Sequence, residues 1–140
     1  MPAMNYLLDT CTCVELLHGN EQVNQRLSEV GLAQCCICEI TWAELLFGIE
    51  YNPKHFGEQK QAETRQQLEA FRASLTVLPI SQAIPDFARE KARLWLLGLP
   101  IEDEDIYIGC TARCHGLTLV TDNVKHMARI EGLRIQNWKA

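Results

Sequence analysis

Short apolar runs alternate with longer amphipathic stretches along the chain. The runs are bounded by polar or turn-forming residues, which is typical of buried strands; they cover residues 5–9, 32–38, 76–79, 117–121 and 133–136. Between them, the spacing of hydrophobic positions predicts helices over residues 12–18, 20–30, 39–50, 58–74, 81–97 and 103–115, and a helical turn over residues 123–128. This alternation predicts an α/β fold, a three-layer α/β/α domain around a central, mostly parallel sheet.

The predicted helix over residues 39–50 is unusual because hydrophobic side chains surround almost its whole circumference. Such a helix is expected to be mostly buried. Glu44 lies within it, on the same face as Ile40 and Phe47. Because an unpaired carboxylate is costly to bury, Glu44 either reaches solvent at the helix edge or has a partner such as a metal ion.

The composition is that of one globular domain. The 140 residues are 47% hydrophobic and 22% charged, without a linker or low-complexity segment. A chain of this length can bury a core without disulfides, so we expect a single domain over residues 1–140. No apolar run approaches the ~18 residues that span a membrane, and the first residues lack the features of a signal peptide. We therefore expect a cytoplasmic protein with no membrane partner.

Seven cysteines stand out in the composition: Cys11, Cys13, Cys35, Cys36, Cys38, Cys110 and Cys114. An odd number in a chain without an export signal disfavours a disulfide framework. Their spacings also differ from the C-x2-C pairs that are common in structural zinc sites. Buried cysteine behaves as a small hydrophobic residue, so core packing is the favoured interpretation and a zinc or redox role is the alternative.

The formal net charge of −5 shows no basic footprint of a nucleic-acid-binding protein. The distribution is uneven, however. Residues 1–105 hold 16 acidic and 8 basic side chains, whereas residues 106–140 hold 2 acidic and 5 basic ones. Lys125, Arg129 and Arg134 in the basic part are candidates for phosphate contacts, and ordinary surface charge is the alternative.

Four carboxylates fall where an α/β fold places its binding sites, outside the carboxyl ends of the strands. Asp9 ends the first predicted strand, and Asp122 directly follows the strand over residues 117–121. Asp105 lies in the first turn of a helix, where the helix dipole favours a negative charge, and Glu44 is the fourth. Each has an ordinary alternative, such as a turn or cap for Asp9 and a helix-start charge for Asp105.

The coincidence of these carboxylates in one small domain favours a metal site. Carboxylates gathered without a cation repel one another, and some of them have raised pKa values. Oxygen ligands suit Mg²⁺ or Mn²⁺, which bind a few carboxylates together with waters and substrate phosphates. Because such an ion attracts phosphodiesters, an acidic site is compatible with an RNA substrate.

Four segments and the C-terminal sequence over residues 130–138 resemble the PIN-domain ribonucleases, most closely the VapC-type toxins of bacterial toxin–antitoxin systems. The segments are YLLDT at residues 6–10, ITWAELLFGI at 40–49, DIYIGCTA at 105–112 and HGLTLVTDN at 115–123. Their order and spacing are kept, so the resemblance covers essentially the whole chain. It implies a PIN-like fold and a Mg²⁺- or Mn²⁺-dependent endoribonuclease that hydrolyses RNA phosphodiester bonds and acts as a toxin.

The resemblance also implies roles for single residues. Asp9, Glu44 and Asp105 match the catalytic metal-site carboxylates of the family. Three further residues are expected to orient the metal ligands or to bind substrate: Thr10, Thr121 and Asn123.

Two positions depart from the family pattern. Cys11 stands where the family commonly has Asn, so any hydrogen bond from that amide is lost. The family's strand-end Asp or Asn matches Asn123, which offers only a neutral oxygen, and Asp122 is the alternative fourth metal ligand.

The partners follow chiefly from the resemblance. It implies an RNA substrate, a cognate antitoxin whose tail covers the acidic site, and a homodimer. Trp95, Leu96 and Leu97 add bulk that is compatible with an interface, although core packing explains them equally well. Two other functions remain alternatives: a non-catalytic PIN-like binding module, and a cysteine-based zinc or redox sensor.

Overall fold

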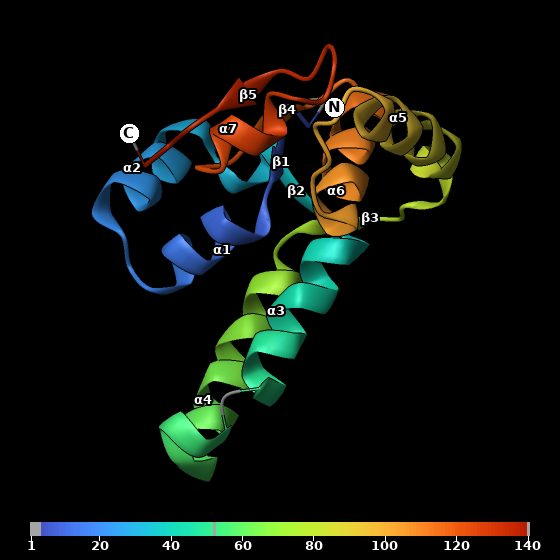
Figure 1. The fold of residues 1–140 in the computed structure, drawn as a ribbon. Helices are drawn as coiled ribbons and strands as arrows, with labels where there is room; N and C mark the ends of the chain where they lie inside the picture. The colour runs from blue at the N-terminus through green and yellow to red at the C-terminus, as the bar shows by residue number, and fades with distance from the viewer. Residues whose placement is uncertain (1–3, 52, 140) are drawn as a thin grey trace.

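The computed structural model describes residues 4–51 and 53–139. Its five strands form one sheet in the order β3-β2-β1-β4-β5, and every neighbouring pair is parallel. The strands are β1 (Tyr6–Leu8), β2 (Cys35–Cys38), β3 (Thr76–Leu78), β4 (Thr118–Val120) and β5 (Ile135–Gln136). Figure 1 shows helices on both sides of this sheet. The predicted α/β/α architecture is therefore confirmed.

The helices lie close to the predicted ranges. They are α1 (Thr10–Leu17), α2 (Glu21–Val30), α3 (Glu39–Tyr51), α4 (Pro53–Ala73), α5 (Ile84–Leu96), α6 (Asp103–Cys114) and α7 (Val124–Met127), with 3-10 turns at Leu32–Gln34 and Ser81–Ala83. The largest difference is α4, which begins at Pro53 rather than at residue 58. Proline suits the first position of a helix, because its missing N–H has no partner there.

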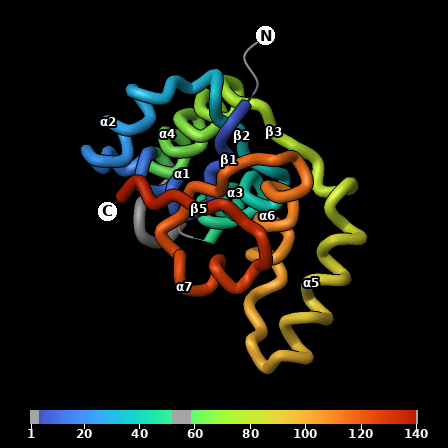
Figure 2. Tube along the Cα trace, turned by 90° about the horizontal axis from the view of Figure 1, so that it is seen from above, coloured from blue at the N-terminus to red at the C-terminus, as the bar shows by residue number. Residues whose placement is uncertain are grey.

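The alternation of side chains along each strand builds two hydrophobic layers. On one face, Leu8, Ile37 and Val120 pack with residues of the first four helices. On the other face, Leu7 and Leu119 pack with residues of α6 and the segment around α7. Figure 2 shows α5 as the outermost element on the side of α6. The carboxyl ends of β1 and β4 are adjacent. The acidic residues that follow these two strands therefore lie at the same edge of the sheet, and the two hydrophobic layers hold that edge in place.

The helix expected to be mostly buried is only partly so. Thr41, Leu45 and Ile49 of α3 are buried, but Phe47 is 64% exposed. The reason is visible in Figure 1: α3 and α4 pair as a hairpin that projects away from the sheet. In the part of α3 that projects beyond the sheet and its covering helices, α4 covers one side of the helix, and Phe47 on another side stays exposed.

Most of the cysteines are core residues: Cys13, Cys35, Cys36, Cys38 and Cys110 are buried, whereas Cys11 is half-buried and Cys114 is exposed. All seven are free, and the three in β2 are buried in the sheet. Burial raises the pKa of Cys36 to about 12 and that of Cys35 to about 11, which disfavours the reactive thiolate at neutral pH. This placement favours the packing interpretation over a zinc or redox sensor.

Hydrophobicity along the helices gives a separate result. In the part of the chain that the structure describes, no helix is both long and apolar enough to cross a membrane.

Candidate active site

Asp9 occupies the centre of the sheet edge. It follows β1 directly, its backbone N–H donates to the Val120 carbonyl of neighbouring β4 at 2.9 Å, and it is the N-cap of α1. Its side chain is only 4% exposed. Thr10 N–H donates to Asp9 Oδ1 and the Thr121 hydroxyl donates to Asp9 Oδ2, each at 2.7 Å. Both carboxylate oxygens are thus held from neighbouring strand ends.

Glu44 reaches the same region from α3. The Thr10 hydroxyl donates to Glu44 Oε1 at 2.6 Å and lies 3.2 Å from Thr41 Oγ1. Thr41 is fully buried on α3, one turn before Glu44. Thr10 therefore connects the start of α1 to α3, and it gives the half-buried Glu44 the partner that the sequence left open.

The three carboxylates influence one another. Burial, followed by the charges of Asp9 and Glu44, raises the pKa of Asp105 to about 6. Burial also raises the pKa of Glu44, with a smaller contribution from the charge of Asp9. The pKa of Asp9 is raised by burial despite its hydrogen bonds from Thr121 and Thr10. Asp9, Glu44 and Asp105 are therefore brought together in one weakly solvated, negatively charged site.

Asp122 and Asn123 take different directions after β4. Asp122 Oδ2 lies 3.8 Å from Lys139 Nζ, although the charge of Asp122 still contributes to the raised pKa of Asp9. Asn123 instead extends its Nδ2 toward Asp105 Oδ2, at 3.5 Å, and its backbone N–H donates to Thr121 Oγ1 at 3.0 Å. Asn123 thus contacts Asp105 of the acidic site, while Asp122 as a metal ligand stays a prediction.

Cys11 lies beside Asp9. Its Sγ is 3.8 Å from Asp9 Oδ2 and 3.4 Å from Thr121 Oγ1. Burial and the charge of Asp9 raise the pKa of Cys11 to about 11. The thiol therefore stays protonated at neutral pH and packs against the two residues as a weak hydrogen-bond partner.

The donor set fits a hydrated hard cation. Within residues 4–51 and 53–139, no three or more His, Cys, Asp or Glu side chains converge as a ready-made ligand shell. Mg²⁺, however, keeps several waters and needs only one or two carboxylates in proteins. The three neighbouring carboxylates offer oxygen ligands only. The charges of Asp9 and Glu44 contribute, after burial, to the raised pKa of Asp105, and a cation would offset this repulsion. Asp9, Glu44 and Asp105 thus suit Mg²⁺ or Mn²⁺.

Two of the predicted phosphate-contacting residues have partners within the chain. Arg129 Nη1 donates to the Pro100 carbonyl at 3.1 Å, and Arg134 donates to the Gly116 carbonyl. These contacts connect the two arginines to the loops that contain Pro100 and Gly116, which is an ordinary structural role. Lys125 is an exposed residue of α7 and stays a candidate for contact with phosphate.

We expect Asp105→Asn to stabilise the protein when no metal is added. Because the pKa of Asp105 is raised to about 6 by folding, its ionised form opposes folding, and stability is lost as pH rises through that value. The neutral amide removes this effect, so the unfolding midpoint at pH 7 should rise by about 2–4 °C. Thermal unfolding at pH 7 and at pH 4 measures it.

The gain from Asp105→Asn should vanish at pH 4, where Asp105 of the unmodified chain is already protonated in the folded state. Asp103→Asn is the matched control, since the Asp103 carboxylate lies outside the site, 3.0 Å from Lys91 Nζ. A stability loss in Asp105→Asn at pH 7 would contradict the assignment of Asp105 to a site where burial and neighbouring carboxylates oppose its ionisation.

Fold and site together define a class of protein. A parallel α/β/α sheet with three carboxylates near the carboxyl ends of its central strands places its candidate site where open α/β folds bind their ligands. The chain belongs to the PIN-domain family, whose model matches residues 6–133.

Known proteins resemble the chain over nearly its full length. It is 30% identical over 137 residues to the tRNA(fMet)-specific endonuclease VapC of Salmonella typhimurium and, separately, to Ribonuclease VapC2 of Haemophilus influenzae. Each match covers 96% of this chain and 98% of the relative. One of these relatives is named as a tRNA(fMet)-specific endonuclease and the other as a ribonuclease.

Solved structures agree with this assignment. The DNA-bound VapBC structure from Salmonella typhimurium has a TM-score of 0.85 at 29% identity, covering 96% of this chain and 98% of the matched one. FitAcB from Neisseria gonorrhoeae has a TM-score of 0.84 at 25% identity, covering 95% and 97%. The fold and its full extent are therefore shared with proteins solved in toxin–antitoxin complexes such as VapBC.

Proposed function

We propose that this protein is a single-domain, cytoplasmic endoribonuclease that depends on Mg²⁺ or Mn²⁺ and acts as the toxin of a toxin–antitoxin pair. The observation that carries the proposal is that Asp9, Glu44 and Asp105 lie near enough at the sheet edge of a PIN domain for the charges of Asp9 and Glu44 to help raise the pKa of Asp105, after burial. Full-length relatives with ribonuclease names support the choice of RNA as substrate. We leave Asp122 outside the ligand set because its carboxylate approaches Lys139.

Different residues of the chain have different roles in the proposed hydrolysis. A bound divalent ion stabilises charge on the phosphate and lowers the pKa of a coordinated water. Asp9 and Asp105 would hold that ion, with Asp9 fixed by hydrogen bonds to both of its oxygens. Glu44 has Oε1 engaged by Thr10, so its other oxygen is available to bind the ion or to accept a proton from the attacking water.

RNA cleavage should require an added divalent ion. With Mn²⁺ or Mg²⁺ at millimolar concentration, purified protein should cleave RNA, and excess EDTA should reduce the rate by roughly 100-fold or more, because both water activation and phosphate charge stabilisation depend on the ion. Initial rates on a mixed RNA substrate, measured by gel electrophoresis, test this. Restoration of the rate by Mn²⁺ after EDTA is the control, and equal rates with and without EDTA would contradict metal dependence.

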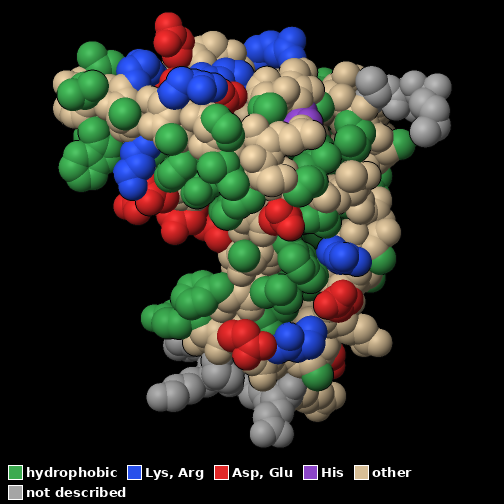
Figure 3. Space-filling model, turned by 90° about the vertical axis from the view of Figure 1, so that its right-hand side faces the viewer, with side chains coloured by type: hydrophobic (Ala, Val, Ile, Leu, Met, Phe, Trp, Pro, Cys, Tyr) green, Lys and Arg blue, Asp and Glu red, His purple; other side chains and the backbone are tan. Residues whose placement is uncertain are grey.

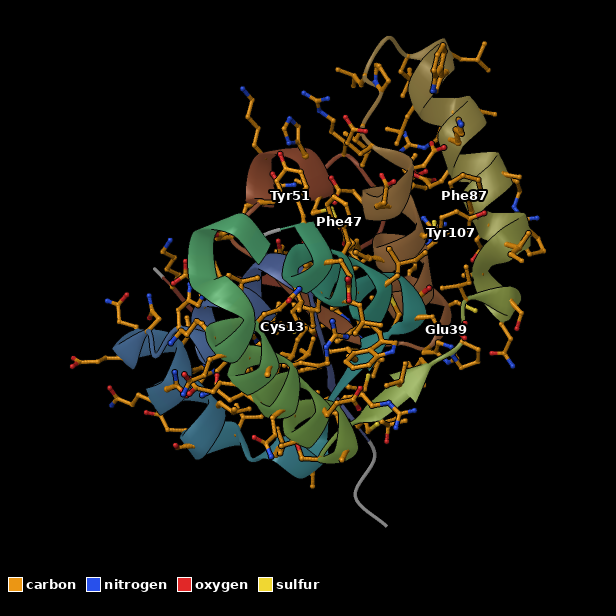
Figure 4. All side chains as sticks on the ribbon, turned by 90° about the horizontal axis from the view of Figure 1, so that it is seen from below. Cys13, Glu39, Phe47, Tyr51, Phe87 and Tyr107 are labelled. Atoms are coloured by element: carbon orange, nitrogen blue, oxygen red, sulfur yellow. The ribbon has the colours of Figure 1, made fainter. Side chains whose placement is uncertain are left out.

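A groove beside the site suits a cationic, partly apolar inhibitor. Figure 3 shows the molecule hollowed between the body and the α3–α4 hairpin, with acidic side chains on one side and hydrophobic ones on the other. Figure 4 shows Phe47 and Tyr51 on α3; they are 64% and 71% exposed and stack with ring centroids 5.5 Å apart. Glu104 of α6 is near enough for its charge to raise the pKa of Glu44, after burial and the charge of Asp9.

We infer that this groove receives the cognate antitoxin, since apolar side chains anchor an interface and opposite charge orients it. VapBC structures among the neighbours support such a partner. Addition of the purified product of the adjacent small reading frame should suppress RNA cleavage. Cleavage by Phe47→Ala should be suppressed less, because this variant lacks an apolar anchor of the groove. Equal suppression of the two proteins would contradict inhibition at the groove.

A homodimer is part of the same proposal. Trp95 and Leu97 at the end of α5 are 64% and 58% exposed, and Leu96 is 88% exposed. Contiguous exposed hydrophobic side chains of this kind mark interaction surfaces. Sedimentation at micromolar concentration should give twice the mass of one chain, and a monomer mass would contradict the dimer.

A further inference from the structure

Asn123 and His126 form a hydrogen-bonded pair at the edge of the candidate active site. His126 Nδ1 lies 3.0 Å from Asn123 Oδ1, and Asn123 Nδ2 lies 3.5 Å from Asp105 Oδ2. Asn123 is also anchored through its backbone N–H to Thr121, the residue that binds Asp9. The pair therefore extends the network of the acidic site outward to α7.

The orientation of the Asn123 carboxamide determines which nitrogen of His126 carries a hydrogen. An ionised carboxylate only accepts hydrogen bonds, so the amide nitrogen of Asn123 is the end that favours Asp105. The amide oxygen then faces His126, and because this oxygen only accepts, Nδ1 of His126 must donate. A neutral His126 is consequently held as the Nδ1–H tautomer.

We propose that His126 is a positioning residue of the metal site: its Nδ1–H engages Asn123 Oδ1, so that Asn123 presents a hydrogen-bond donor, and not a ligating oxygen, to Asp105. Asp105 Oδ2 is thereby restrained, while Oδ1 stays available to an ion. Asn at this position is then a residue that orients a ligand rather than a weakened fourth ligand. The metal part of this inference rests on the proposed function.

The magnitude follows from the geometry. Hydrogen bonds that orient metal ligands are typically worth 10- to 100-fold in metal affinity. The contact from Asn123 to Asp105 is long at 3.5 Å and His126 acts only through Asn123, so the expected effect falls below that range. Loss of the His126 donor should weaken Mn²⁺ binding by about 3- to 10-fold.

The tautomer of His126 is the direct test, and it needs no metal. Two-bond ¹H–¹⁵N correlation spectra at about pH 8.5, above the ordinary imidazole pKa of about 6.5, distinguish the two neutral forms. We expect Nδ1–H for His126 in the unmodified chain and a shift toward Nε2–H in Asn123→Ala. His18, an exposed residue at the end of α1, is the internal reference. An Nε2–H form of His126 in the unmodified chain would overturn the proposal.

Metal affinity is the second test, with the variants chosen by shape. His126→Phe keeps a ring and removes the donor, His126→Asn places an amide N–H where Nδ1 stood, and His18→Phe is the matched control. Mn²⁺ titration by calorimetry should show about 3- to 10-fold weaker binding for His126→Phe and affinities within about twofold for the other two. Unchanged affinity in His126→Phe, or equal losses in the Phe and Asn variants, would contradict positioning through this hydrogen bond.

The two tests separate failure of the inference from failure of the proposed function. If the unmodified chain binds no Mn²⁺ but His126 is the Nδ1–H tautomer, the metal-dependent function fails while the hydrogen-bonded pair stands. If Mn²⁺ binds and His126→Phe leaves the affinity unchanged, the nuclease proposal stands and the positioning role is wrong.

Discussion

Asp9→Asn is expected to reduce RNA cleavage by roughly 1000-fold. The change removes a negative charge from the centre of the metal site and keeps the shape of the side chain. Asp9 is held by Thr10 N–H and by the Thr121 hydroxyl, so its charge is fixed where a cation would bind. Because burial raises the pKa of Asp9, a neutral side chain is tolerated here and the fold should persist. Initial rates with Mn²⁺, together with thermal unfolding, measure both effects.

Asp122→Asn is the matched control for this experiment. It makes the same chemical change at the same sheet edge, but the Asp122 carboxylate approaches Lys139. We expect its cleavage rate to stay within about threefold of the unmodified protein, in line with the small contribution of an exposed ion pair. A loss as large as that of Asp9→Asn would assign Asp122 as a fourth ligand. Full activity in Asp9→Asn would contradict the active site itself.

The sequence predicted the acidic residues but not their neighbourhood. Asp9 was visible because an apolar run ends in a carboxylate, and Glu44 because a charge interrupts a hydrophobic helix. Their convergence depends on the order of the strands, in which β1 lies between β2 and β4, and strand order cannot be read from one sequence. The resemblance to the PIN-domain ribonucleases supplied that information, because it carries the fold of the whole family.

The choice between Asp122 and Asn123 shows where local sequence reasoning stops. Both residues follow β4, and one residue decides which side of the sheet edge a side chain faces. Thr121 turns inward to Asp9, and Asp122 approaches Lys139, a partner at the far end of the sequence. His126 carried no signal at all, since its hydrogen bond to Asn123 depends on the path of α7.

Hydrophobic periodicity also failed to predict the α3–α4 hairpin. The pattern of α3 is the same for a helix buried in a core and for a helix that projects from it. Phe47 was therefore expected to be buried, whereas it is exposed and stacks on the exposed Tyr51. Such exposed apolar side chains are what an interaction surface requires, so the error in the predicted burial coincides with the groove proposed for the antitoxin.

Glu90 organises a buried ionic network outside the active site, where α5, α6 and the segment after α7 meet. Its side chain is only 5% exposed. Arg93 Nη2 lies 2.7 Å from Glu90 Oε2 and Arg113 Nη1 lies 3.4 Å from Oε1, while Glu131 N–H donates to Oε2 at 3.3 Å. Burial opposes ionisation, but the hydrogen bonds from Arg93 and Glu131 N–H and the charges of both arginines outweigh it and lower the pKa of Glu90.

Glu90→Ala is expected to destabilise the fold by about 3 kcal/mol, because it removes the charged hydrogen bonds of Arg93 and Arg113 to a buried carboxylate and leaves the Glu131 N–H without its acceptor. The unfolding midpoint at pH 7 should fall by roughly 10 °C. Since the pKa of Glu90 is lowered by folding, its contribution is present above the ordinary glutamate pKa and is lost as pH falls through the folded value; the gap between the two proteins should therefore narrow in acid. Urea unfolding at pH 7 and at about pH 3.5 measures this.

Glu131→Ala supplies the comparison, because its carboxylate is 76% exposed and lies 3.8 Å from Arg93 Nε. An exposed pair of this kind contributes less than about 1 kcal/mol, so that variant should unfold close to the unmodified protein. Equal effects of the two changes would contradict the network. A large effect of Glu90→Ala alone would support the network as an anchor of α6, which carries Asp105 near its start and Arg113, the partner of Glu90, near its end. The active site would then depend on this ionic contact, because the contact stabilises the helix that supplies one of the proposed ligands.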